Sequence, residues 1–119
     1  MSFQSVIDRL MERVPEALAV TFNDKDGDPI TISAAKLPKE AMQLLGAYQS
    51  VVQRTLKQAV EEFDQGEIQM AAFATGDHWI LMTVLKESCT LVLVMQREGI
   101  LGRARFELET AAQALNAEL

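Results

Sequence analysis

Reactive and metal-binding side chains are scarce in this chain of 119 residues, which has one cysteine and one histidine. A single cysteine excludes an intrachain disulfide, and because Cys89 lies in an apolar segment, we expect its thiol to be buried and unreactive. His78 opens an expected strand beside Asp77. We expect it to be an ordinary turn-end residue, since no second nitrogen or sulfur ligand lies at metal-binding spacing.

Motifs of catalysis are missing as well. The segment 99–102, Gly-Ile-Leu-Gly, lacks the lysine and the strand-to-helix context of a phosphate-binding loop. The three aspartates of segment 24–28 are spaced like calcium ligands, but an EF-hand loop requires a glycine and a bidentate acid where this chain has Pro29 and Ala35. With one histidine, the serine and threonine hydroxyls have no evident general base. We therefore predict a non-enzyme that uses no metal and no other cofactor.

Positive charge and long apolar runs are also limited. The 17 acidic residues outnumber the 11 basic ones, the net charge is -6, and the basic residues are scattered. Nucleic acid is therefore an unexpected partner, because phosphate backbones require a basic stripe. No apolar run approaches the roughly 20 residues of a membrane span, and Asp8 and Arg9 interrupt the first apolar segment, which argues against a signal peptide. We expect a soluble, cytoplasmic protein.

The chain does contain a large apolar fraction, 49 %, which is sufficient for one core and predicts a single domain over residues 1–119. Apolar residues recur at helical spacing in segment 3–14, where Ser5 and Asp8 fit the offset of a capping box and Pro15 closes the helix.

A hairpin is predicted next along the chain. Segments 18–22 and 30–32 alternate between apolar and smaller or polar residues, and Asp26-Gly27 lies between them. An Asp-Gly pair favours a tight turn, because glycine adopts the positive φ that such a turn requires.

The longest predicted element is a helix from Pro38 to about Phe63. Its apolar residues fill an arc wide enough to lie across a sheet, and its opposite face is polar. Gly46 and Ser50 lie one turn apart in the middle of that polar face, where glycine costs about 1 kcal/mol relative to alanine. Small residues there would let a second helix approach closely, and a tolerated surface glycine is the alternative interpretation.

Segments 68–74, 79–85 and 89–95 are rich in strand-forming residues and are separated by short polar breaks, which predicts an antiparallel meander. The last two segments are apolar at both alternating positions, so we expect helices to cover both faces of the sheet. A final helix begins near Gly99 and carries an apolar stripe. Phe106 falls opposite that stripe, either as a contact residue or as an isolated exposed aromatic.

Five segments, taken in order and spacing, carry a resemblance to a known family. They are the helix end Val14-Pro15-Glu16, the hairpin 19–30, the long helix from Pro38, the strand 89–94 and the following segment 99–105, Gly-Ile-Leu-Gly-Arg-Ala-Arg. The pattern resembles the Roadblock family, which comprises dynein light chain and bacterial gliding-protein-B type modules that associate with small Ras-like GTPases. The resemblance covers nearly the entire chain.

The resemblance implies an α+β sandwich of profilin-like topology, in which a five-stranded antiparallel sheet has the long helix on one face and the two terminal helices on the other. It also implies a homodimer whose long helices lie side by side and whose sheets join through segment 67–74. On this view, the polar residues Glu67, Gln69 and Thr75 interrupt a strand that would otherwise be an apolar, unpaired edge.

The function that this resemblance implies is that of a non-catalytic homodimeric regulator or scaffold for a small Ras-like GTPase. In the GTPase-regulating members, the paired helices position the switch segments and insert no catalytic residue. The alternative is a small-ligand sensor or generic adaptor module of profilin/PAS-like topology, which would need a cavity between sheet and helix. The predicted dimer or partner interface consists of Gln43, Gly46, Ala47, Ser50, Arg54, Lys57, Glu67, Gln69 and Phe106.

Overall fold

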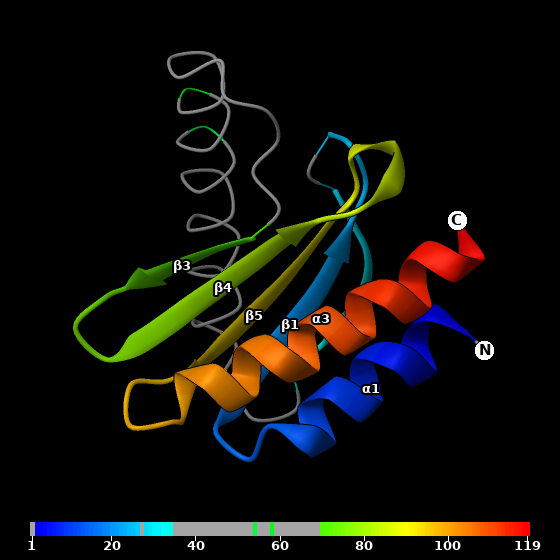
Figure 1. Cartoon of the computed structure of the whole chain (residues 1–119). Helices are drawn as coiled ribbons and strands as arrows, with labels where there is room; N and C mark the ends of the chain where they lie inside the picture. The colour runs from blue at the N-terminus through cyan, green and yellow to red at the C-terminus, as the bar shows by residue number, and fades with distance from the viewer. Residues whose placement is uncertain (1, 27, 35–53, 55–57, 59–69) are drawn as a thin grey trace.

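Two helices lie on one side of a five-stranded sheet (Figure 1). The structure is a computed structural model that describes residues 2–26, 28–34, 54, 58 and 70–119. Its elements are α1 (Phe3–Arg13), β1 (Ala17–Asn23), β2 (Pro29–Ser33), β3 (Met70–Ala74), β4 (His78–Val84), the short turn η1 (Lys86–Ser88), β5 (Thr90–Gln96) and α3 (Leu101–Glu118).

The strand order is β2-β1-β5-β4-β3, and every neighbouring pair is antiparallel. The first and last strands of the chain therefore pair in the middle of the sheet, in a register that runs from Ala17 opposite Met95 to Asn23 opposite Thr90. Strands β2 and β3 lie at the two ends of this order. The predicted α+β fold with a five-stranded antiparallel sheet is confirmed, as is the meander of β3, β4 and β5.

Both faces of the central strands are buried, because alternate side chains of a strand point to opposite faces. On the α1/α3 face, Leu81, Leu91 and Leu93 are at most 1 % exposed and belong to the main core. On the opposite face lies a second buried cluster, formed by Ala19, Ile80, Met82, Val92 and Val94. The predicted two-sided burial of these strands is confirmed.

The long helix predicted for residues 38–63 lies almost wholly outside the described residues. Only Arg54 and Gln58 of this segment are described, and both are helical and exposed. Arg54 was predicted to lie on the polar face, which agrees with its exposure.

The predicted cap of α1 is wrong by one turn. Ser2, not Ser5, is the N-cap residue: the Ser5 backbone N–H donates to Ser2 Oγ at 3.1 Å, and the Ser5 hydroxyl donates to the Ser2 carbonyl oxygen at 2.8 Å. A capping hydroxyl satisfies one of the free N–H groups of the first turn, and Ser2 can do so because the apolar stripe already begins at Phe3. Val6, Ile7, Leu10 and Met11 are buried, as their spacing predicted.

The turn between β4 and β5 is longer than predicted, so Leu85 and Cys89 lie outside the strands. Glu87 and Ser88 adopt φ values of 60° and 61°, in the left-handed region. The Leu85 N–H donates to the Cys89 carbonyl oxygen at 2.8 Å, and the Cys89 N–H donates to the Lys86 carbonyl oxygen at 3.2 Å. These bonds close the turn, and Cys89 remains buried at its end.

Helix α3 packs its predicted stripe against the sheet and against α1. Its buried residues are Ala104, Leu108, Ala111, Ala112 and Leu115. Phe106, on the other side of this helix, is 65 % exposed, as predicted. In the part of the chain that the structure describes, no helix has the length and hydropathy needed to cross a bilayer.

Candidate interaction surfaces

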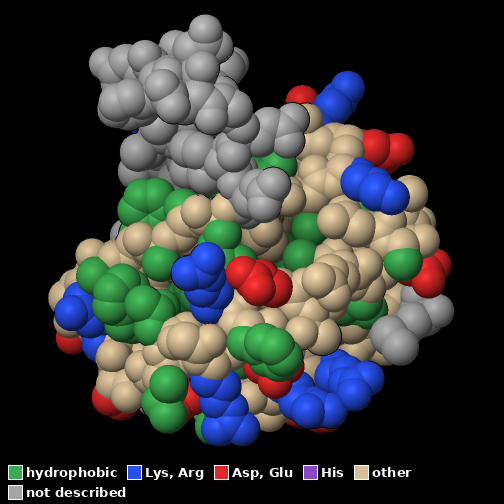
Figure 2. All heavy atoms as spheres, in the orientation of Figure 1, with side chains coloured by type: hydrophobic (Ala, Val, Ile, Leu, Met, Phe, Trp, Pro, Cys, Tyr) green, Lys and Arg blue, Asp and Glu red, His purple; other side chains and the backbone are tan. Residues whose placement is uncertain are grey.

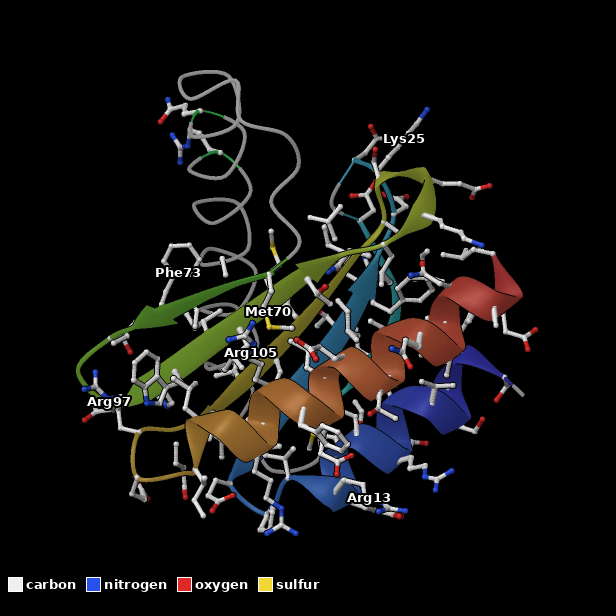
Figure 3. All side chains as sticks on the ribbon, in the orientation of Figure 1. Arg13, Lys25, Met70, Phe73, Arg97 and Arg105 are labelled. Carbon is white, nitrogen blue, oxygen red and sulfur yellow. The ribbon has the colours of Figure 1, made fainter. Side chains whose placement is uncertain are left out.

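Strand β3 forms one end of the sheet, and part of it is open to solvent. It pairs only with β4 among the described residues. Ala72 and Ala74, which lie opposite Leu81 and Trp79, are exposed. Phe73 points to the opposite face, where it packs against the second buried cluster (Figure 3). The exposed side chains along this edge, those of Ala72 and Ala74, are therefore small.

The register of the β3–β4 hairpin indicates which backbone groups face the open edge. Thr75 and His78 form a hydrogen-bonded pair, since the Thr75 N–H donates to the His78 carbonyl oxygen at 2.9 Å. In an antiparallel ladder, bonded and non-bonded pairs alternate. The N–H and C=O groups of Ala72 and Ala74 therefore point away from β4, and no described strand pairs with them.

The end of this hairpin is held by Arg97, which lies in the loop before α3 (Figure 3). The Arg97 guanidinium lies 4.9 Å from the centre of the Trp79 ring, and its Nη1 donates to the Thr75 carbonyl oxygen at 2.7 Å. The Arg97 backbone N–H donates to the Asp77 carbonyl oxygen at 3.2 Å. A cation above an aromatic face and two hydrogen bonds thus tie the β3–β4 turn to the loop that follows β5.

At the other end of the sheet, the aspartates of the β1–β2 turn form hydrogen bonds with one another. Asp24 Oδ1 accepts hydrogen bonds from the backbone N–H groups of Asp26 and Asp28, at 2.9 and 3.0 Å. Such a side-chain turn holds the loop in place. Among the residues that the structure describes, no group of three or more His, Cys, Asp or Glu side chains is arranged to hold a metal ion.

Cys89 is 6 % exposed, and its pKa is raised. Burial is the main cause, because it disfavours the charged thiolate, and the carboxylates of Glu87 and Asp24 add to the shift. The thiol therefore remains protonated at neutral pH. Nucleophilic cysteines have the opposite property, a lowered pKa.

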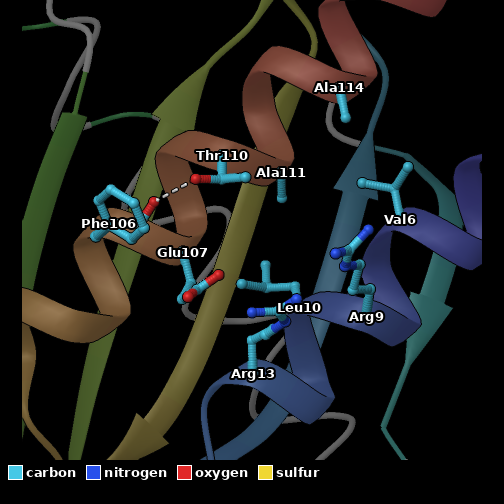
Figure 4. Close-up of a pocket in the computed structure, with 9 residues that line it drawn as sticks. All are labelled: Val6, Arg9, Leu10, Arg13, Phe106, Glu107, Thr110, Ala111 and Ala114. Atoms are coloured by element: carbon cyan, nitrogen blue, oxygen red, sulfur yellow. Dashed lines mark hydrogen bonds between the residues drawn. The ribbon is translucent and has the colours of Figure 1, made fainter.

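Most of the predicted interface residues lie outside the described part of the chain, namely Gln43, Gly46, Ala47, Ser50, Lys57, Glu67 and Gln69. Arg54 is helical and exposed. Phe106 lines a groove between α1 and α3 (Figure 4). The structure therefore does not bring it together with the residues of the β3 edge. Sequence reasoning missed Arg97 and the groove, because neither leaves a periodic signal.

Comparison with solved structures gives strong matches over the whole fold. MglB of Myxococcus xanthus is similar to this chain with a TM-score of 0.81 and 19 % identity, over 97 % of this chain and 92 % of that one. A Roadblock/LC7 domain from Streptomyces avermitilis matches with a TM-score of 0.82 and 15 % identity, over 97 % and 95 % of the two chains. No family model and no curated protein matches the sequence.

A lower similarity extends to profilin. The chain matches a structure described as the complex of LokiProfilin1 with rabbit actin, with a TM-score of 0.63 and 14 % identity, over 100 % of this chain and 98 % of that one. The predicted profilin-like topology is therefore confirmed at the level of the fold.

Proposed function

We propose, from the premise that this chain has the Roadblock/LC7 fold, that it is a non-catalytic homodimeric regulator or scaffold that binds a small Ras-like GTPase. The observation that carries the proposal is the open edge of β3. Free backbone groups on a flat edge strand attract a further strand, which is why monomeric proteins usually block such edges with charges or prolines. Residues 70–74, Met-Ala-Ala-Phe-Ala, contain neither.

Pairing of two copies through β3 would join their sheets into one, related by a two-fold axis. The small side chains of Ala72 and Ala74 pose little steric obstacle to the second copy. Thr75, Trp79 and Arg97 hold the adjoining hairpin, so the edge is presented in one geometry before pairing.

The paired long helices would form the platform for the GTPase in this proposal. Arg54, which is exposed, contributes a guanidinium that can form two parallel hydrogen bonds with a carboxylate of the partner. Gln43, Gly46, Ala47, Ser50 and Lys57 are the other residues predicted to lie on this platform. The chain would act by holding the switch segments of the GTPase in one conformation, which changes the equilibrium between its states by differential binding.

The dimer is tested by light scattering coupled to size exclusion. We expect twice the 13.2 kDa mass of one chain at micromolar concentration. An Ala72→Pro variant removes an N–H that points to the open edge, so it should remain folded and become monomeric. The matched variant Ala71→Pro removes an N–H from the β3–β4 ladder, so it should lower stability. A monomeric wild-type protein, or a dimeric Ala72→Pro variant, would contradict pairing through β3.

GTPase binding is tested separately, by calorimetry with the purified small Ras-like GTPases of the same genome, each loaded with GDP or a non-hydrolysable GTP analogue. We expect one of them to bind with a preference for one nucleotide state, and Arg54→Glu to weaken that binding about tenfold or more, because it places a negative charge where a positive one is proposed to pair. If none binds in either state, the GTPase role is wrong, whereas the dimer is unaffected by that result.

A further inference from the structure

A groove of about 300 Å³ runs between α1 and α3, on the side of these helices that faces away from the sheet (Figure 4). Its apolar lining comes from Val6 and Leu10 of α1 and from Ala111 and Ala114 of α3. The two alanines explain why the groove exists, since a larger side chain at either position would fill the space between the helices.

The α1 side of the groove is basic. Arg9 and Arg13 lie one helical turn apart, so their side chains are neighbours, and both are exposed and line the groove. Within the described residues, no carboxylate lies at salt-bridge distance from either guanidinium. By contrast, Arg105 of α3 is 3.4 Å from Glu109. The space-filling view shows Lys and Arg side chains along this margin of the molecule (Figure 2).

The α3 side of the groove has a different character. Glu107 is half-buried there, and Phe106 and Thr110 lie beside it. The Glu107 carboxylate repels negative groups from the α3 wall, so an acidic partner has its favourable position on the α1 wall. The groove therefore has an apolar floor, one basic wall and one wall that disfavours carboxylates.

We propose that this groove is a docking site for an amphipathic helical segment of another protein, with aliphatic side chains on the floor and Asp or Glu side chains along one flank that pair with Arg9 and Arg13. Helices bind apolar grooves through residues at i, i+3, i+4 and i+7. The apolar floor here lies between two helices that run side by side, which is the kind of surface that such a helix covers (Figure 1). Arg9 and Arg13, which pair with no carboxylate of the described residues, supply the charge complementarity, because a guanidinium binds carboxylates through two hydrogen bonds.

An elongated segment fits the groove better than a small carboxylate ligand does. Small-molecule sites bury most of the surface of their ligand, whereas this groove is bounded by only two helices and is open on its outer side (Figure 4). The site lies on the α1/α3 face and not at the β3 edge. The proposed GTPase platform, on which this step rests, belongs to the opposite face in the fold that the resemblance implies. A protein with both surfaces can link a GTPase to a third protein.

The test uses two fluorescently labelled 16-residue helical peptides. The acidic peptide has leucines at i, i+3, i+4 and i+7 and glutamates along one flank, and the second peptide has lysines in place of those glutamates. We expect only the acidic peptide to raise its fluorescence anisotropy on binding, with affinity that falls at higher salt. In NMR spectra of the full chain, it should shift the amide signals of Leu10, Thr110 and Ala111.

Two sets of variants locate the site. The double variant Arg9→Glu/Arg13→Glu should weaken binding of the acidic peptide about tenfold or more, and Ala114→Leu, which fills the groove and keeps the charge, should also weaken it. The double variant Arg103→Glu/Arg105→Glu makes the same change in net charge on α3 outside the groove, so it should retain binding apart from a small nonspecific loss. Circular dichroism confirms that each variant is folded.

Four outcomes would overturn the proposal. Equal binding of the two peptides would show that charge plays no part, and equal losses in the two double variants would show that binding depends on net charge alone. If light scattering without peptide gave a lower mass for the Arg9→Glu/Arg13→Glu variant than for the wild type, the groove would be a contact between copies of this chain. Cosedimentation with phosphatidylserine vesicles that requires Arg9 and Arg13, without peptide binding, would identify it as a membrane contact.

Discussion

Gly99 is a residue at which the structure leaves no room for a side chain. It lies where the loop after β5 passes the residue before β1, and the Gln96 N–H donates to the Glu16 carbonyl oxygen at 3.0 Å. A Cβ atom at position 99 would collide with the end of the Met95 side chain and would lie 2.9 Å from Cβ of Glu16.

Gly99→Ala should therefore lower the free energy of unfolding by about 1–3 kcal/mol, the usual cost of overpacking. Gly102 is the matched control, because a Cβ there meets nothing within 4 Å and the residue lies in α3. Gly102→Ala should raise stability by up to about 1 kcal/mol, through helix propensity. Urea unfolding measures both. Equal effects of the two substitutions would contradict the close approach at Gly99.

The raised pKa of Cys89 predicts that the stability of the protein depends on pH in the alkaline range. Its pKa is raised in the folded state, so the folded protein retains the thiol proton at pH values where the unfolded chain has lost it. The contribution of the Cys89 thiol to the free energy of unfolding is fully present below the ordinary thiol pKa of about 8.5, and it is lost as the pH rises above that value. The unfolding free energy of the wild type should fall relative to that of Cys89→Ala as the pH rises above about 8.5. Parallel pH profiles would show that burial leaves the thiol unaffected.

At the scale of elements, β5 is the strand on which the core depends most. It lies in the centre of the sheet, and residues 91–95 are buried on both faces. Leu93→Ala should cost about 2–5 kcal/mol, since it leaves a cavity that the neighbouring strands and helices fill only in part. Val84→Ala, in β4 and 40 % exposed, should cost less than about 1 kcal/mol. A small loss for Leu93→Ala in denaturant unfolding would contradict its position in the core.

The β4–β5 turn uses non-glycine residues in a conformation that favours glycine. Ser88 has a φ of 61°, and the turn is anchored by the Lys86 N–H, which donates to Asn116 Oδ1 at 2.9 Å. Left-handed backbone costs roughly 1–2 kcal/mol for a residue with a Cβ, and glycine avoids that cost at some expense of entropy. Ser88→Gly should raise the unfolding free energy by about 0.5–1 kcal/mol, whereas Thr90→Gly, in β5, should lower it. Destabilisation by Ser88→Gly would indicate that the Ser88 side chain has a stabilising contact.

At the scale of the whole molecule, substitution of Ser50 is predicted to change assembly without changing stability. It lies outside the described residues and is predicted to face a second long helix. Ser50→Arg inserts a long charged side chain at that position, so the monomer should remain folded and lose its dimer contact, its GTPase contact or both. Gln58→Arg, at an exposed helical position that is not among the predicted interface residues, is the control. Light scattering and GTPase binding are the measurements, and wild-type values for Ser50→Arg would show that this face is solvated surface.

Local periodicity was sufficient for much of the fold. The apolar stripe of α1, the hairpin around Asp26, the strands of the meander and the exposed position of Phe106 all depend on spacings of two to four residues, which the sequence displays directly. The capping residue of α1 was misassigned because Ser2 and Ser5 both lie near the start of the apolar stripe, and only the hydrogen bond to Ser2 Oγ distinguishes them.

The sequence by itself determined which faces of each element are apolar, and hence that a sheet is covered on two sides, because burial of those faces is the main driving force of folding. Only the tertiary structure decided which elements meet: that β1 pairs with β5, that Arg97 lies over Trp79, and that two alanines of α3 leave a groove beside Arg9 and Arg13. These contacts join residues far apart in the chain. A periodic pattern specifies a face but not its neighbour, so such contacts follow from packing in three dimensions alone.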